Sequence, residues 1–131
     1  MIEFNSFLLN ASYWVLPLII AIPMHEAAHA IAAKYFGDET AYKLKRATLN
    51  PLKHIDPIGT ILLPGILIFI GAPFIFGYAK PVPITIANLK NPKKDMIWIA
   101  LAGPFTNAIL AILGAILLSL VLLIPGDVGD W

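Results

Sequence analysis

The chain has 131 residues, of which 59% are hydrophobic and only 13% are charged, with a formal net charge of +1 and no cysteine. A soluble domain carries roughly 25% charged residues, so this composition excludes an ordinary water-soluble fold and indicates an integral membrane protein in contact with the lipid bilayer. The lack of cysteine excludes disulfides, thiolate zinc sites and cysteine nucleophiles, and the near-neutral charge gives no reason to expect a nucleic-acid partner.

Three apolar blocks run along the chain, at residues 7–33, 58–79 and 96–124, and polar connectors at 34–57 and 80–95 separate them. A helix needs ~20 residues to cross a bilayer, so each block is long enough to span. We therefore predict a single all-α domain over residues 1–131, an integral membrane fold. Two transmembrane helices would lie around a middle segment that either re-enters or spans the membrane.

The first block contains the motif His25-Glu26-Ala27-Ala28-His29. Residues four apart share one face of a helix, so His25 and His29 can offer imidazole nitrogens to one metal ion. Glu26 lies one position round the helix, where it can act as general base toward water; this is the arrangement of zinc-dependent peptidases. Ionisable side chains are costly in an apolar helix and are usually functional there, which favours a Zn²⁺ site over a chance match.

The distribution of basic residues bears on the middle block. All nine lysines and arginines lie between Lys34 and Lys94, five before the block and four after it. Positive charge marks the cytoplasmic side in short loops. A spanning block would place the two basic connectors on opposite faces, whereas a re-entrant block leaves every cation cytoplasmic and both termini outside. We prefer the re-entrant form, with chain breaks at Pro64-Gly65 and Gly71-Ala72-Pro73, and keep a kinked spanning helix as the alternative.

The third block carries a stripe of small and polar residues at successive i+4 positions. Such a stripe lets two helices approach closely, so we predict that it contacts the helix with the two histidines, with Asn107 facing the site. The stripe consists of Gly103, Asn107, Ala111, Ala115 and Ser119.

Four segments in this order and spacing resemble the site-2 proteases, which are intramembrane zinc metalloproteases, and in particular their compact prokaryotic branch without PDZ domains. The resemblance implies that His25 and His29 hold zinc and that Glu26 is the catalytic base. It also implies membrane protein substrates that are cut in or near their transmembrane segments. The site would open to the cytoplasm from the plasma membrane of a prokaryote. The segments are the motif at 25–29, Leu49 to Thr60 (LNPLKHIDPIGT), Gly77 to Pro83 (GYAKPVP) and Ala102 to Asn107 (AGPFTN).

The chain departs from this family at the third zinc ligand. In the family that ligand is an Asp of a later helix, within a pattern like Asn-Leu-Leu-Pro-x-x-Pro-Leu-Asp-Gly, and nothing here matches it. Catalytic zinc normally has three protein ligands and a water. We therefore expect a domain truncated at its C-terminus, inactive as it stands. Asp56 and His54 are the less favoured substitutes for the missing ligand.

Two other classes of function compete with the protease. One is a catalytically inactive membrane scaffold or binding protein of the same fold, which a downstream Leu-Asp-Gly segment in the parent gene would argue against. The other is a metal transporter, which would need ionisable residues on more than one helix. The sequence carries them on one.

Overall fold

In the computed structural model, residues 2–74 and 76–123 are described, and their secondary structure is entirely helical, without a strand. This confirms the all-α prediction for that part of the chain. The end of the third predicted block, at Ile124, lies outside it. The elements are α1 (Ile2–Tyr35), α2 (Thr40–Lys43), the 3₁₀ helix η1 (Pro51–His54), the π-helix η2 (Pro57–Leu62), α3 (Leu63–Phe69), the 3₁₀ turn η3 (Ile86–Asn88) and α4 (Pro92–Leu122).

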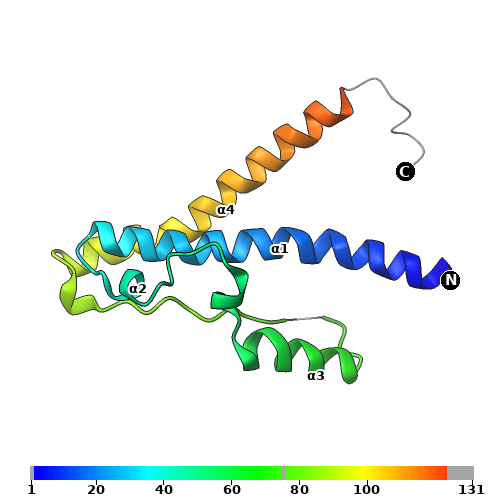
Figure 1. The fold of residues 1–131 in the computed structure, drawn as a ribbon, viewed down its shortest axis with the longest axis horizontal. Coiled ribbons are helices and arrows are strands. Elements are labelled where there is room, and N and C mark those ends of the chain that lie inside the picture. Colours follow the sequence, from blue (N-terminus) through cyan, green and yellow to red (C-terminus); the bar gives the residue numbers. More distant parts are fainter. Residues whose placement is uncertain (1, 75, 124–131) are drawn as a thin grey trace.

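The first and third blocks form the two long helices α1 and α4 (Figure 1). They touch near the C-terminal part of α1 and the N-terminal part of α4, then diverge like the arms of a V (Figure 1). By length and composition alone, Val15–Tyr35 and Pro92–Leu122 could each cross a membrane. Pro17 and Pro23 both lie inside α1, which continues through them.

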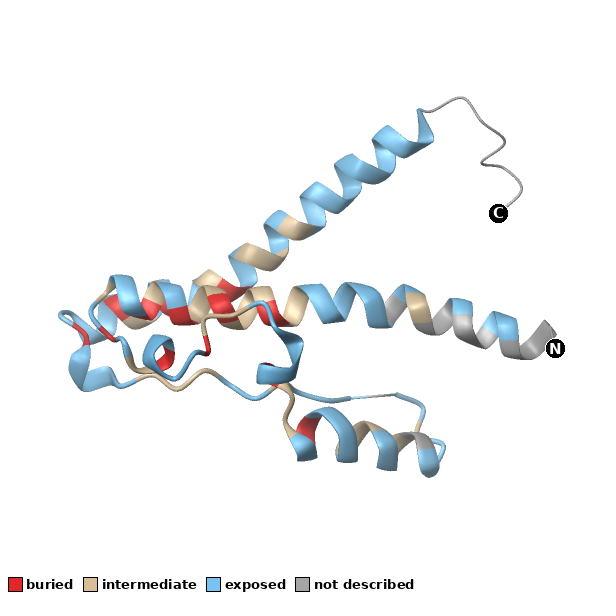
Figure 2. Ribbon diagram, in the orientation of Figure 1, coloured by how far each residue is buried: buried red, intermediate tan, exposed pale blue. Residues whose placement is uncertain are grey.

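The buried core is small and lies at the end of the molecule where the helices touch. It consists mainly of alanines of α1 packed near Ile99 of α4 and Leu89 of the preceding connector. Away from this end, most of the residues of both helices whose burial is described are exposed (Figure 2). Leu16 of α1 is 61% exposed and Leu117 of α4 is 64% exposed. The long arms therefore present apolar side chains to their surroundings on most faces.

The middle block is a hairpin with a helical outward arm and an extended return arm. The outward arm is η2 followed by α3, and the chain turns at Gly71, whose φ of +65° favours glycine. The extended return arm comes back to its starting point, where the Lys80 amide donates to the His54 carbonyl at 2.8 Å. The two ends of the middle block are therefore neighbours.

Only one of the two predicted breaks reverses the chain. Gly71 makes the turn, whereas Pro64 lies in a continuous helical run at the change from π to α geometry. In a π-helix the Gly59 carbonyl would accept from residue 64, and proline has no N–H to donate. That carbonyl accepts instead from the Tyr78 amide of the return arm, at 3.0 Å. The proline thus frees an acceptor that joins the two arms.

Asp38 ties the two connectors together. Its side chain is fully buried, and its carboxylate accepts from the Thr40 amide and hydroxyl, the Thr85 amide and the Asn88 side chain at 2.6–3.1 Å. Burial alone would raise the pKa of Asp38, but these hydrogen bonds outweigh it and hold the pKa below its ordinary value. The carboxylate is therefore ionised in the folded chain and fixes η3 beside the end of α1.

Asp38→Asn is expected to lower the free energy of unfolding by about 2 kcal/mol, because hydrogen bonds to a charged group contribute about 1.5–3 kcal/mol. Since folding lowers the pKa of Asp38, its contribution is fully present above about pH 3.9 and is lost as the pH falls through the lowered pKa. Thermal unfolding in detergent micelles, followed by circular dichroism at about pH 7 and at a series of acidic pH values below it, measures both effects.

The matched control is Glu39→Gln, because Glu39 forms only an exposed ion pair with Lys43 at 3.2 Å. Such pairs contribute about 0–1 kcal/mol. Equal unfolding midpoints for the native chain and Asp38→Asn at neutral pH would contradict the role of Asp38.

Candidate metal centre

The site lies where α1 and α4 cross, and Gly103 sets the distance between them. A Cβ added at Gly103 would overlap Nε2 of both His25 and His29. The two Nε2 atoms therefore point at the same small region of space. The imidazole centroids are 4.7 Å apart and nearly perpendicular. Two consecutive turns of α1 thus direct two nitrogens to one point, as the motif predicts.

The backbone of α4 fixes the tautomer of His29. Nδ1 of His29 lies 2.6 Å from the carbonyl oxygen of Ile99, which can only accept. Nδ1 therefore carries a proton, and in the neutral ring Nε2 keeps its lone pair. This is the state in which a neutral imidazole can bind a metal through Nε2.

The Nδ1 atom of His25 faces a side chain of α4, whereas that of His29 faces the backbone. His25 Nδ1 lies 3.1 Å from Nδ2 of the Asn107 side-chain amide, and the Oδ1 atom of that amide is buried without a hydrogen-bond partner. The contacting residues of α4 have the same four-residue spacing as the two histidines of α1. They are Ile99, Gly103 and Asn107. One face of α4 thus contacts both imidazoles.

The predicted small-residue stripe is confirmed at Gly103 and Asn107 and is wrong beyond them. The remaining positions do not contact α1 because the helices diverge after the crossing (Figure 1). The Ser119 hydroxyl donates to the Ala115 carbonyl of its own helix at 2.8 Å. The exposed members of the stripe are Ala111, Ala115 and Ser119.

The donor set suits zinc but has two members. Imidazole is a common zinc ligand, and a side chain at position 103 would occupy the point that both Nε2 atoms face. Within residues 2–74 and 76–123, no third His, Cys, Asp or Glu completes a metal-holding group. Asp127 and Asp130 lie outside these ranges. Glu26 follows His25 on α1 and is half-buried.

Asp56 and His54, the substitute third ligands, have local structural partners. The Asp56 carboxylate caps η2, where it accepts from the amides of Ile58 and Gly59 at 2.9 and 2.8 Å. His54 is buried, with Nε2 at 2.9 Å from the Thr48 carbonyl. Both contacts are those of turn and cap residues.

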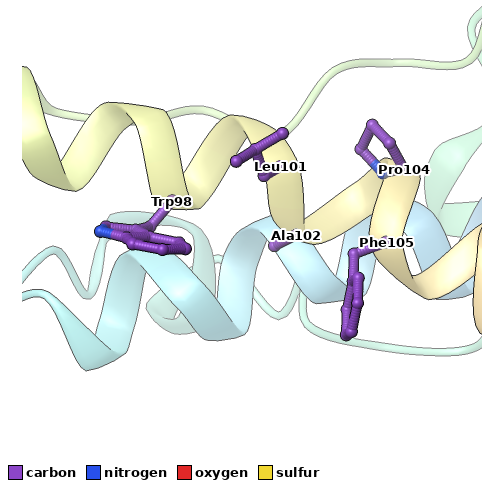
Figure 3. Close-up of a pocket in the computed structure, with 5 residues that line it drawn as sticks. All are labelled: Trp98, Leu101, Ala102, Pro104 and Phe105. Carbon is purple, nitrogen blue, oxygen red and sulfur yellow. The ribbon is translucent and has the colours of Figure 1, made fainter.

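An apolar depression lies on α4 beside the crossing (Figure 3). Trp98 and Phe105 project from the same side of the helix and are 60% and 67% exposed. None of the residues that line it is a metal-binding or proton-transferring group. The residues that line it are Trp98, Leu101, Ala102, Pro104 and Phe105.

Comparison with known proteins finds two relatives with informative names. A Bacillus subtilis (strain 168) protein named "Putative zinc metalloprotease YwhC" is 45% identical over 108 residues, which are 82% of this chain and 46% of the relative. A Mycolicibacterium smegmatis protein named "Putative zinc metalloprotease Rip2" is 31% identical over 107 residues, 82% of this chain and 38% of the relative. The chain therefore spans less than half the length of either relative. No family model and no solved structure matches it.

Gly103→Ala is expected to lower the free energy of unfolding by about 1–3 kcal/mol, because the added methyl group overlaps both imidazoles and forces the helices apart. Gly114→Ala on the same helix is the matched control, since a Cβ there meets nothing within 4 Å. Alanine is the better helix former by about 1 kcal/mol, so this control should be neutral or stabilising. Thermal unfolding in micelles compares the two, and equal midpoints would contradict the close crossing.

Proposed function

We propose that the chain is the zinc-binding part of an intramembrane metalloendopeptidase of the site-2 protease family. The observation that carries the proposal is the convergence of the Nε2 atoms of His25 and His29 on one point. The names of the two relatives support a zinc metalloprotease function in general. The intramembrane setting and the membrane-embedded substrates are our extension of it.

In this proposal each polar residue of the motif takes part in the reaction. His25 and His29 hold zinc through Nε2, and His29 is already in the tautomer that this requires. Bound zinc supplies Lewis-acid polarisation of a carbonyl and makes water more acidic. Glu26 accepts the proton of the attacking water and delivers it to the leaving amine, as a general base and then a general acid.

The proposed membrane arrangement has two spanning helices and a re-entrant hairpin. It is supported by the apolar exposure of α1 and α4 and by the meeting of the hairpin ends at His54 and Lys80. Both basic connectors lie at the end of the molecule that holds the helix crossing (Figure 1). With those connectors in the cytoplasm, the histidine pair lies near the cytoplasmic face.

The topology can be tested with single cysteines, because the native chain has none. Cysteines at Lys53 and Lys93, which flank the hairpin on exposed sites, should react with a membrane-impermeant maleimide from the cytoplasmic side only. A cysteine at the exposed Asn5 should react from the opposite side, since α1 lies between. Labelling of Lys53→Cys and Lys93→Cys from opposite faces would contradict the hairpin and make the middle block a spanning helix.

The enzyme proposal is tested with Glu26→Gln, which removes the base but keeps the size of the side chain. The variant should retain about one zinc per chain and cut a model transmembrane substrate about 10²–10⁴-fold more slowly. His25→Ala and His29→Ala should lose the zinc as well. Metal analysis and substrate cleavage are measured on the 131-residue chain and on a version extended by the family's Leu-Asp-Gly helix.

Glu39→Gln is the control for a carboxylate lost outside the site. The extended chain should be the active one, because two ligands leave the zinc geometry undefined. A Glu26→Gln variant as active as its parent would refute the assigned base. An extended chain that binds zinc without cleaving would favour the non-catalytic scaffold. Full activity of the 131-residue chain would mean that it supplies its own third ligand.

A further inference from the structure

Asn107 is a residue of the site to which the proposed chemistry gives no role. It lies on the α4 face that contacts the histidines, and in the structure its Nδ2 atom, a donor, is 3.1 Å from His25 Nδ1. Its Oδ1 atom is buried without a hydrogen-bond partner. A buried amide oxygen is normally hydrogen-bonded, so an orphaned one beside an imidazole needs an explanation.

The chemistry of His25 supplies the explanation. A metal ion on Nε2 takes the lone pair of that nitrogen, and the proton of a neutral imidazole must then be on Nδ1. Only an acceptor can face Nδ1–H. The oxygen and nitrogen of an asparagine amide are nearly equal in size and exchange by a half-turn of the side chain. After that half-turn, Oδ1 faces Nδ1–H of His25 and is no longer orphaned.

We infer that Asn107 is a positioning residue that accepts the Nδ1–H hydrogen bond of His25 and so holds this histidine as a zinc ligand; the inference rests on the proposed zinc site. The second ligand is held in the same way by a different group, since His29 Nδ1 meets the Ile99 carbonyl at 2.6 Å. Metal-binding histidines usually donate their second ring N–H to such an acceptor, and its loss typically weakens metal binding about 10–100-fold.

The partner of His25 is a side chain and can be replaced, whereas the partner of His29 is backbone. Asn107→Asp keeps the shape and can only accept, so it should bind zinc at least as tightly as the native chain. Asn107→Leu has no acceptor and should bind zinc about 10–100-fold more weakly. Thr106→Ala is the matched control, because the Thr106 hydroxyl donates to the Ala102 carbonyl of its own helix at 2.8 Å. It should leave zinc affinity unchanged.

The experiment is zinc titration against a competing chelator in micelles at a fixed neutral pH. The ring N–H proton of His25 in ¹⁵N-histidine-labelled, zinc-loaded protein is followed in parallel. We expect a slowly exchanging Nδ1–H signal in the native chain and in Asn107→Asp, and fast exchange in Asn107→Leu. A purely structural role, in which the amide donates to Nδ1, predicts instead that the Asp variant binds as poorly as the Leu variant.

The outcomes separate this inference from the proposed function. If the native chain binds no zinc, both are refuted. If the native chain binds zinc and Asn107→Leu binds it equally well, only the inference is refuted. An Asp variant as weak as the Leu variant overturns it too. If the Leu variant does not fold, the inference is tested by the zinc affinity of the Asp variant and by the exchange rate of the His25 Nδ1–H signal in the native chain.

Discussion

The missing side chain at Gly103 sets the closest approach of α1 and α4, and the polar contacts of the site depend on it. A methyl group there would overlap both imidazoles, and the Ile99 carbonyl would move away from His29. Imidazole N–H groups in an apolar environment are costly unless they are hydrogen-bonded, by about 1–3 kcal/mol in proteins. The glycine therefore stabilises the histidine pair indirectly, because it brings backbone and amide acceptors within reach.

The paired histidines and the close approach of the helices could be predicted because they follow from local spacing. His25 and His29 are four apart, and Gly103 and Asn107 repeat that spacing on the partner helix. How far the contact between α1 and α4 continues along the helices could not be predicted from residue spacing. Small residues continue along α4 after the crossing, but the crossing angle depends on how side chains interlock in three dimensions. The role of the Ile99 carbonyl was also hidden, since backbone acceptors have no sequence signature.

The structure of the middle block could also be predicted only in part. The basic residues on both sides of it favour a re-entrant segment, which stays a prediction; the structure shows that the two ends of the block meet at His54 and Lys80. The shape of the turn was only half predicted, because Pro64 was expected to break the chain and instead frees the Gly59 carbonyl for the return arm. Asp38 was overlooked. Two of its four donors, the Thr85 amide and the Asn88 side chain, lie 47 and 50 residues away, and no local pattern connects them to it.

The long separation between the histidines and their partners also has a consequence for synthesis. Ile99 and Asn107 follow His29 and His25 by 70 and 82 residues. At about 5–20 residues per second, the ribosome makes those partners roughly 4–16 s after the histidines. For that time the imidazoles of the new α1 can be satisfied only by water or by nearby residues. The contacts of the histidine pair are therefore completed late, when α4 packs against an α1 that has already been made.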